Sequence, residues 1–216
     1  MTTDITYLAP ELHLRNPQIS DVEAVAQLTL DVCTRDGDAA VATSAADLRQ
    51  TWQEPGFNLS ENTWVVETTD GKIVGYEELY DHHRHAALEG DGYVHPQFEG
   101  LGIGTAMLRV MEIRARQLMQ QAEPDLHVYV RNCMGLSDAR SHEMHRNEGY
   151  LPIRYSWRME IQLDAPPVSP RWPDGVELRP YQPGEQSRAV FEAVNESFRD
   201  HWGHTPMKYE NWILRT

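Results

Sequence analysis

The feature that most constrains the fold is a run that starts as an apolar strand and passes through three glycines into a long helix. It reads Tyr93-Val94-His95-Pro96-Gln97-Phe98-Glu99-Gly100-Leu101-Gly102-Ile103-Gly104-Thr105-Ala106. Glycine carries no side chain, so the backbone amides of such a turn can approach an anion closely. The positive end of the helix dipole adds to the attraction. The run therefore predicts a turn that binds a phosphate or a pyrophosphate.

The remaining pattern predicts strands and helices in a mixed order. Alternating apolar and polar residues predict strands at 11–15, 63–68, 72–80, 88–94, 126–130 and 153–163. Apolar residues at helical spacing predict helices at about 22–32, 44–52, 103–120 and 138–147. Because this order mixes hairpins with helical crossovers, we expect an α+β fold whose mixed, mostly antiparallel sheet is flanked by helices.

A proline-rich linker, residues 165–175, separates a domain at 1–164 from a shorter segment at 176–216. The segment repeats the layout of the chain's opening, with a strand at Val176–Arg179, a helix at Glu185–Arg199 and a second helix at Thr205–Trp212. This strand-helix-helix extension is an incomplete copy, and a fragment of about 40 residues cannot bury its own apolar face. We expect it to pack on the first domain or on a second chain, and the second arrangement would give a homodimer.

Charge and cysteine content exclude several classes of function. The formal net charge is −14, which disfavours binding to nucleic acid and to anionic membranes. Cys33 and Cys133 lack the spacing of a disulfide framework or a zinc site, and the N-terminus lacks the features of a secretory signal. The histidine-rich run 81–85 fits a solvated loop better than a metal site. We therefore expect a cytoplasmic protein that binds no metal.

The layout, the glycine turn and the segment Asn147-Glu148-Gly149-Tyr150 resemble the GCN5-related N-acetyltransferase (GNAT) superfamily. That family carries Arg/Gln-x-x-Gly-x-Gly/Ala after its fourth strand, and the matching run here is Glu99–Gly104, preceded by the frequent Val94-x-Pro96. The resemblance covers about residues 10–163. The partial copy after residue 175 is similar to the opening of a second GNAT domain, and Asp200-His201-Trp202-Gly203 resembles segments of tandem acetyltransferases of the mycothiol synthase type.

This resemblance implies an enzyme that transfers an acetyl group directly from acetyl-CoA to a primary amine of a small molecule. The main chain of Tyr93 and Val94 would pair with the pantetheine arm as a further strand would. The backbone amides that would hold the pyrophosphate belong to Gly100, Leu101, Gly102, Ile103, Gly104 and Thr105. An anion at a helix N-terminus gains about 0.3–1 kcal/mol, so the physical chemistry of the turn supports this role independently.

Three positions depart from the family pattern. Glu99 replaces the usual Arg or Gln beside the pyrophosphate, and we expect its carboxylate to point to solvent or to pair with a cation such as Arg131. Asp138 replaces the usual Asn of the following motif, which places it among the cofactor-binding candidates. His145 stands where the family often has the tyrosine that protonates the departing thiolate. A histidine can act as a general acid, and the alternative is a helix-surface histidine without a catalytic role.

Acetyl transfer to an amine also needs a base, or a chain of waters, that takes the proton of the ammonium group. The candidate carboxylates on the third and fourth strands are Glu77, Glu78, Glu89 and Asp91. Neighbours on a strand face opposite sides, so at most one of Glu77 and Glu78 lines the cleft. Asp91 is preferred because it is nearest to Val94, and Glu78 is retained beside it. The alternatives are a catalytically degenerate GNAT-like module that binds CoA or acts as a scaffold, and an enzyme that uses another acyl-CoA.

Overall fold

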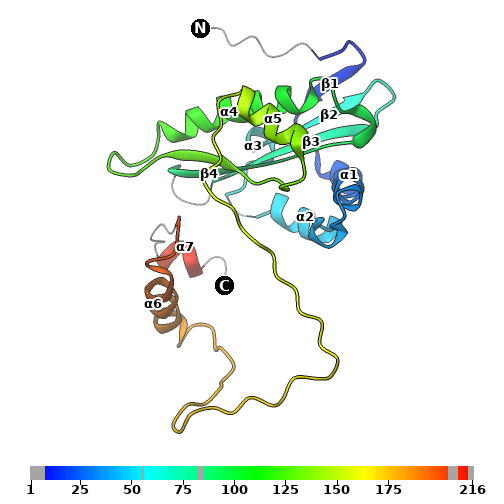
Figure 1. Cartoon of the computed structure of the whole chain (residues 1–216). Coiled ribbons are helices and arrows are strands. Elements are labelled where there is room, and N and C mark those ends of the chain that lie inside the picture. The colour runs from blue at the N-terminus through cyan, green and yellow to red at the C-terminus, as the bar shows by residue number, and fades with distance from the viewer. Residues whose placement is uncertain (1–7, 55, 82–84, 204–208, 214–216) are drawn as a thin grey trace. The chain divides into compact units, whose positions relative to one another are not determined.

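The computed structural model describes residues 8–54, 56–81, 85–203 and 209–213 (Figure 1). Residues 82–84 of the histidine-rich run lie outside these ranges, so the solvated loop stays a prediction. The chain forms two compact units, Met1–Leu151 and Pro152–Thr216, and each is described by itself. Within the described ranges, no helix is both long and apolar enough to cross a membrane.

The first unit is built on a five-stranded sheet in the order β1-β2-β3-β4-β5. The first four strands are antiparallel to their neighbours, and β5 runs parallel to β4. The strands span Leu12–Arg15 (β1), Thr63–Thr68 (β2), Ile73–Asp81 (β3), Ala87–Val94 (β4) and Tyr129–Asn132 (β5). The expected α+β fold with a mixed, mostly antiparallel sheet is therefore confirmed.

Helices cover both faces of this sheet (Figure 1). One face carries α1 (Val22–Arg35) and α2 (Ala45–Trp52), and the other carries α4 (Ile103–Met119) and α5 (Ala139–Asn147). The short α3 (Leu59–Asn62) precedes β2, and single 3-10 turns form at Ile19–Asp21, Ala39–Val41 and Pro96–Phe98. Each face buries its own apolar cluster, which includes Val25, Leu28, Trp52 and Val65 under α1 and α2, and Leu79, Leu88, Leu108 and Met111 under α4.

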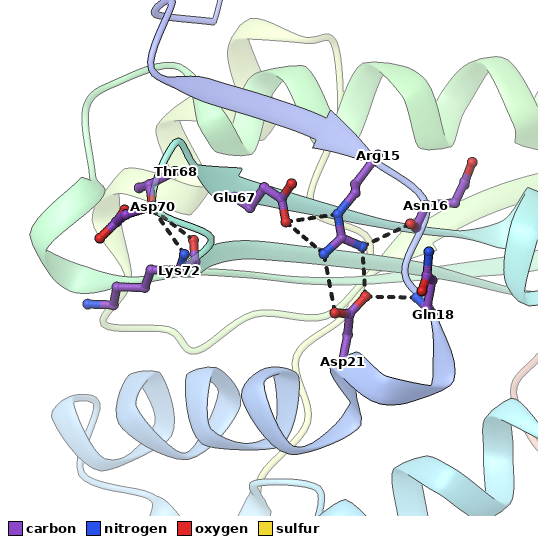
Figure 2. Close-up of polar contacts among 8 residues, drawn as sticks. All are labelled: Arg15, Asn16, Gln18, Asp21, Glu67, Thr68, Asp70 and Lys72. Carbon is purple, nitrogen blue, oxygen red and sulfur yellow. Dashed lines mark hydrogen bonds and ion pairs between the residues drawn. The ribbon is translucent and has the colours of Figure 1, made fainter.

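A cluster of ion pairs ties β1 to β2 and to the start of α1 (Figure 2). Arg15 Nη1 donates to Asp21 Oδ2 at 2.7 Å, and Arg15 Nε donates to Glu67 Oε2 at 2.8 Å. Burial alone would raise the pKa of Asp21, but the hydrogen bonds from Arg15 and from the backbone N–H of Gln18, together with the charge of Arg15, outweigh it and lower that pKa. The next hairpin is closed by Thr68 Oγ1, which accepts from the backbone N–H of Lys72 at 3.1 Å.

The predicted final strand at Ile153–Leu163 is wrong, because these residues form no strand in the structure. Their apolar side chains stay exposed, with Trp157 at 81% and Met159 at 90%. Alternation of apolar residues produces a strand only where a neighbouring strand takes the backbone hydrogen bonds and one face is covered. The strand predicted at 126–130 does form as β5, but it begins three residues later, at Tyr129, and ends two residues later, at Asn132.

The second unit contains α6 (Ser187–Phe198) and α7 (Tyr209–Ile213). The ring of Phe191 lies 5.3 Å from that of Tyr209 and 5.8 Å from that of Trp212, so the two helices share an aromatic contact. The helix expected at 185–199 is confirmed. The strand expected at 176–179 does not form, and residues 205–208 lie outside the described ranges. The domain limits and the homodimer stay predictions.

Candidate active site

The sheet opens where β4 and β5 diverge. Pairing between the two strands runs only from Ala87↔Tyr129 to Gly90↔Asn132. Beyond Gly90, the stretch Asp91–Val94 still pairs with β3, and among the described residues no strand pairs with its other edge. An open strand edge can hydrogen-bond an extended ligand through its main chain. Tyr93 and Val94 lie on this edge.

The glycine turn follows β4 directly and ends at the N-terminus of α4. Gly100 and Gly102 both have φ of +79°, a left-handed backbone that other residues adopt only with strain. Gly102 is the N-cap of α4, so the amides of the first helical turn, from Ile103 to Thr105, have no partner within the helix. Gly104 serves packing instead, because a side chain there would lie 3.0 Å from Sδ of Met144.

The carboxylate of Glu99, just before this turn, is held between two arginines. One of its oxygens accepts from Arg35 at the end of α1, and the other accepts from Arg140 at the start of α5. The expected partner, Arg131, instead donates to Glu89 at 2.8 Å. Glu99 therefore presents no unpaired negative charge to the turn, and it gathers two guanidinium groups beside the turn.

The α1 face of the sheet carries a grid of three tyrosines and three carboxylates, here called the acid–tyrosine ladder. The register places β3 residues opposite β4 residues, and facing partners in a sheet share a face. The pairs of the ladder are Tyr76↔Tyr93, Glu78↔Asp91 and Tyr80↔Glu89.

Hydrogen bonds connect the ladder. Both oxygens of Glu78 accept from tyrosine hydroxyls, one from Tyr76 and the other from Tyr80 at 2.6 Å, and Tyr93 donates to Asp91 at 3.0 Å. Burial raises the pKa of Glu78 to about 7, although the two hydroxyls lower it. Burial also raises the pKa of Asp91. Both groups are thus closer to proton exchange at neutral pH than ordinary surface carboxylates.

A cavity of about 230 Å³ lies at the open end of the ladder. It is lined by Tyr80, Glu89, Gly90, Asp91 and Cys133. The structure therefore places Asp91 on the cavity wall, whereas Glu78 is connected to the cavity through the hydroxyl of Tyr80.

The two candidates near α5 are engaged with protein atoms. Nε2 of His145 lies 3.0 Å from Nδ2 of Asn132, and its Nδ1 lies 2.8 Å from the carbonyl oxygen of Ser141. Burial lowers the pKa of His145. Asp138 caps α5 and accepts from the backbone N–H of Ser141 at 3.0 Å. Each of these side chains is therefore held by neighbouring protein atoms.

Several residues of the candidate site are missing from the sequence prediction. Arg35 and Arg140 at the turn and Asn132 at the opening come from distant parts of the chain, and no local pattern marks them. Tyr150 belongs to the segment 147–150 that carries the family resemblance, but the sequence gives it no role in the site. Glu77 was one of the four candidate carboxylates on the third and fourth strands, and the sequence prediction did not select it. The signal that could have distinguished it is the Gly90-Asp91-Gly92 stretch, because glycines inside a strand often mark a close approach of another group.

The fold and the turn match a known family. The sequence model of the acetyltransferase (GNAT) domain family matches residues 60–149. This part of the chain contains β2 to β5, the glycine turn and α5. This part of the chain is therefore similar to the acetyltransferase domain of the GNAT family in both sequence and fold. A GCN5-related N-acetyltransferase from Sphaerobacter thermophilus is similar to the chain, at 31% identity and a TM-score of 0.81 over 97% of this chain and 64% of that one.

Named relatives are similar to the chain at comparable identity. The mycothiol acetyltransferase of Thermomonospora curvata is 29% identical over 87% of this chain, and that of Thermobispora bispora is 30% identical over 52%. The chain spans 56% of the first relative and 34% of the second. A putative acetyltransferase from Salmonella typhimurium, whose structure contains acetyl-CoA, shares the fold at 17% identity and a TM-score of 0.51, over 65% of this chain and 80% of that one.

Proposed function

We propose that the chain is an acetyl-CoA-dependent N-acetyltransferase that acts on a primary amine of a small molecule. The observation that carries the proposal is the position of the cavity. It lies at the end of the β4–β5 pairing, between the open edge of β4 and an acidic, tyrosine-lined face. A thioester laid along that edge would meet an amine that enters from the α1 face.

The glycine turn fits the diphosphate of CoA. The amides at the start of α4 and the positive end of its dipole favour an anion there. Arg35 and Arg140 add two guanidinium groups, which bind phosphate oxygens well because their donors are planar and paired. We propose that Glu99 keeps these arginines at the turn, which accounts for a carboxylate where the family usually has a cation or an amide.

The acid–tyrosine ladder fits the acceptor. An alkyl amine arrives mostly as an ammonium ion at pH 7, and it must lose a proton before it attacks the acetyl carbon. Asp91 lines the cavity and can hold the ammonium group, while Glu78, with a pKa of about 7, can take the proton through the hydroxyl of Tyr80. Transfer then forms the carbon–nitrogen bond and breaks the carbon–sulfur bond, without an acyl-enzyme intermediate.

An assay of CoA thiol release with a panel of amines (glucosamine, tyramine and putrescine) tests this proposal. Because the base must be ionised, kcat/KM should rise as the pH passes about 7, the pKa of Glu78. Glu78→Gln should remove this rise, and Asp91→Asn should lower kcat/KM by about 100-fold. Glu67→Gln, a carboxylate-to-amide change outside the cavity, is the control and should keep the profile. An unchanged profile in Glu78→Gln would contradict the role of Glu78.

One observation favours a second candidate, a degenerate module that binds CoA without turnover. His145 stands at the family's proton-donor position, but both of its ring nitrogens face protein atoms. This candidate predicts acetyl-CoA binding with no thiol release from any amine, so the same panel separates the two functions. A cytoplasmic location belongs to the first proposal and is supported by the two free cysteines, and the −14 charge favours a cationic acceptor such as an ammonium group.

A further inference from the structure

The carboxyl group of Glu77 lies in a gap that two glycines of β4 leave open. Glu77 is paired with Gly92 across the sheet, and Gly90 is the next β4 residue on the same face. A side-chain carbon on Gly92 would overlap Oε2 of Glu77 and lie 3.0 Å from its Cδ, and one on Gly90 would lie 3.2 Å from Oε1. Neither glycine has a positive φ, so the backbone conformation does not require glycine at these positions. The absence of a side chain makes room for the carboxyl group of Glu77.

This gap meets the opening between β4 and β5. Gly90 belongs to the last pair of the two strands, and Gly92 is exposed just beyond it. Two buried polar atoms lie there without a hydrogen-bond partner among the described residues: Oε1 of Glu77 and Oδ1 of Asn132. Folded proteins rarely leave such atoms unpaired, and the exceptions often mark a functional site.

The gap lies on the face of the sheet that α4 covers. A side-chain carbon on Gly75 would lie 2.7 Å from Ile103, and one on Gly90 would lie 2.7 Å from Met111, and both are α4 residues. A CoA molecule held at the N-terminus of α4 would therefore reach the opening on the same face as Glu77. The inference rests in this respect on the proposed function.

The groups around Glu77 favour its neutral form. Burial raises its pKa, and the charges of Asp91 and Glu78 raise it further. Tyr150 faces it from the segment after α5, and α4 contributes the uncharged Met111 and the carboxylate of Glu112, which hydrogen-bonds Tyr150. Burial also raises the pKa of Tyr150, which weakens that hydroxyl as an acid. Glu77 thus combines a transferable proton with a position at the opening.

We propose that Glu77 is the catalytic acid of acetyl transfer, and that its carboxyl O–H protonates the sulfur of departing CoA. As the amine nitrogen bonds to the acyl carbon, the electron pair of the breaking carbon–sulfur bond moves to sulfur. Sulfur takes the proton of Glu77, and the resulting carboxylate regains a proton from solvent. Glu77 and Glu78 then serve opposite faces of one strand, the first toward the thioester and the second toward the amine.

The variant Glu77→Gln tests the acid, because the amide has nearly the same shape but no acidic proton. We expect its kcat for thiol release to fall about 100-fold, the usual contribution of a general acid. Its dissociation constant for acetyl-CoA and its melting temperature should stay close to wild type. In the wild type, kcat should decline as the pH rises and Glu77 ionises, and this decline should vanish in Glu77→Gln. Glu67→Gln is the matched control and should keep the decline.

Each outcome decides the assignment. If Glu77→Gln keeps the wild-type kcat or the decline of kcat with rising pH, or if it loses acetyl-CoA binding in parallel with kcat, Glu77 is not the acid. If the wild type releases no thiol with any amine of the panel, the proposed function itself fails. The infrared band of a protonated carboxyl group, present in wild type and absent in Glu77→Gln, then reports separately whether Glu77 is a neutral acid. Its absence in wild type would overturn the assignment.

Discussion

Replacing Gly102 with alanine should destabilise the protein more than replacing Gly104, although Gly104 is the more tightly packed. At Gly102 an added carbon meets no atom within 4 Å, but the φ of +79° is strained for alanine. This strain costs about 1–2 kcal/mol. At Gly104 the backbone is helical, and the one tight contact of an added carbon is with the flexible end of Met144, at 3.0 Å, while Cγ2 of Val94 lies at an ordinary 3.6 Å. Alanine there gains about 1 kcal/mol of helix propensity, which offsets the contact.

These values translate into measurable shifts. For a domain of this size, about 2–4 °C of melting temperature corresponds to each kcal/mol, so Gly102→Ala should melt roughly 2–8 °C lower. The strain falls on the N-cap of α4, where the diphosphate is proposed to bind. If alanine relaxes the turn, acetyl-CoA should bind about 5- to 30-fold more weakly, since 1.4 kcal/mol is a factor of ten. Gly104→Ala should stay within about 3 °C of wild type.

Differential scanning fluorimetry gives the melting temperatures, and isothermal titration gives the acetyl-CoA affinities. The two variants differ by one methyl group at positions two residues apart, so each is the control of the other. A larger loss in Gly104→Ala than in Gly102→Ala would refute the assignment of backbone strain to Gly102 and of packing to Gly104.

Three further predictions follow from the described contacts. The double variant of Arg35→Ala and Arg140→Ala should weaken acetyl-CoA binding by roughly threefold to tenfold in low salt and by less in high salt, and equal affinities by titration would contradict this. Iodoacetamide should modify the exposed Cys133, on the cavity wall, more slowly when acetyl-CoA is bound. The buried Cys33 should not react with iodoacetamide in the free or in the bound protein, and mass spectrometry measures the modification of both cysteines. Asp21→Asn should lower the free energy of unfolding by about 1–2 kcal/mol at pH 7. Because the folded pKa of Asp21 lies below its ordinary 3.8, this difference should shrink as the pH falls below about 4, which denaturant melts across pH would show.

The local parts of the site could be predicted from the sequence. The glycine turn depends on consecutive residues, and glycines between a strand and a helix are visible directly in the sequence. The sequence predicts Asp91 as a candidate base because it is nearest to Val94, and the structure places this residue on the cavity wall, while its catalytic role stays a prediction. The sequence also predicted that Glu77 and Glu78 lie on opposite faces, because strand alternation fixes this.

The distant partners could not be predicted in the same way. Glu99 is separated by 64 residues from Arg35 and by 41 residues from Arg140, and only the folded sheet brings them together. Arg131 was nearer in the expected order of elements, but its register on β5 places it opposite Glu89. A single sequence gives strand positions without their pairing, so these contacts needed the tertiary structure.

The missing strand at 153–163 has a related cause. The apolar residues of this segment alternate regularly, and such a pattern indicates which side chains would share one face of a strand. It does not supply the neighbouring strand that a strand requires. The apolar side chains of this segment are exposed in the structure. Light scattering would test the homodimer that the sequence predicts.

The central claim is that the chain moves an acetyl group from CoA to an amine at the β4–β5 opening. The most direct test incubates the wild-type chain with acetyl-CoA and the three amines, and measures free CoA thiol and acetylated amine together by mass spectrometry. We expect the two products in equal amounts with at least one amine, and a loss of both in Asp91→Asn. Binding of acetyl-CoA with no release of thiol and no acetylated amine would contradict the claim.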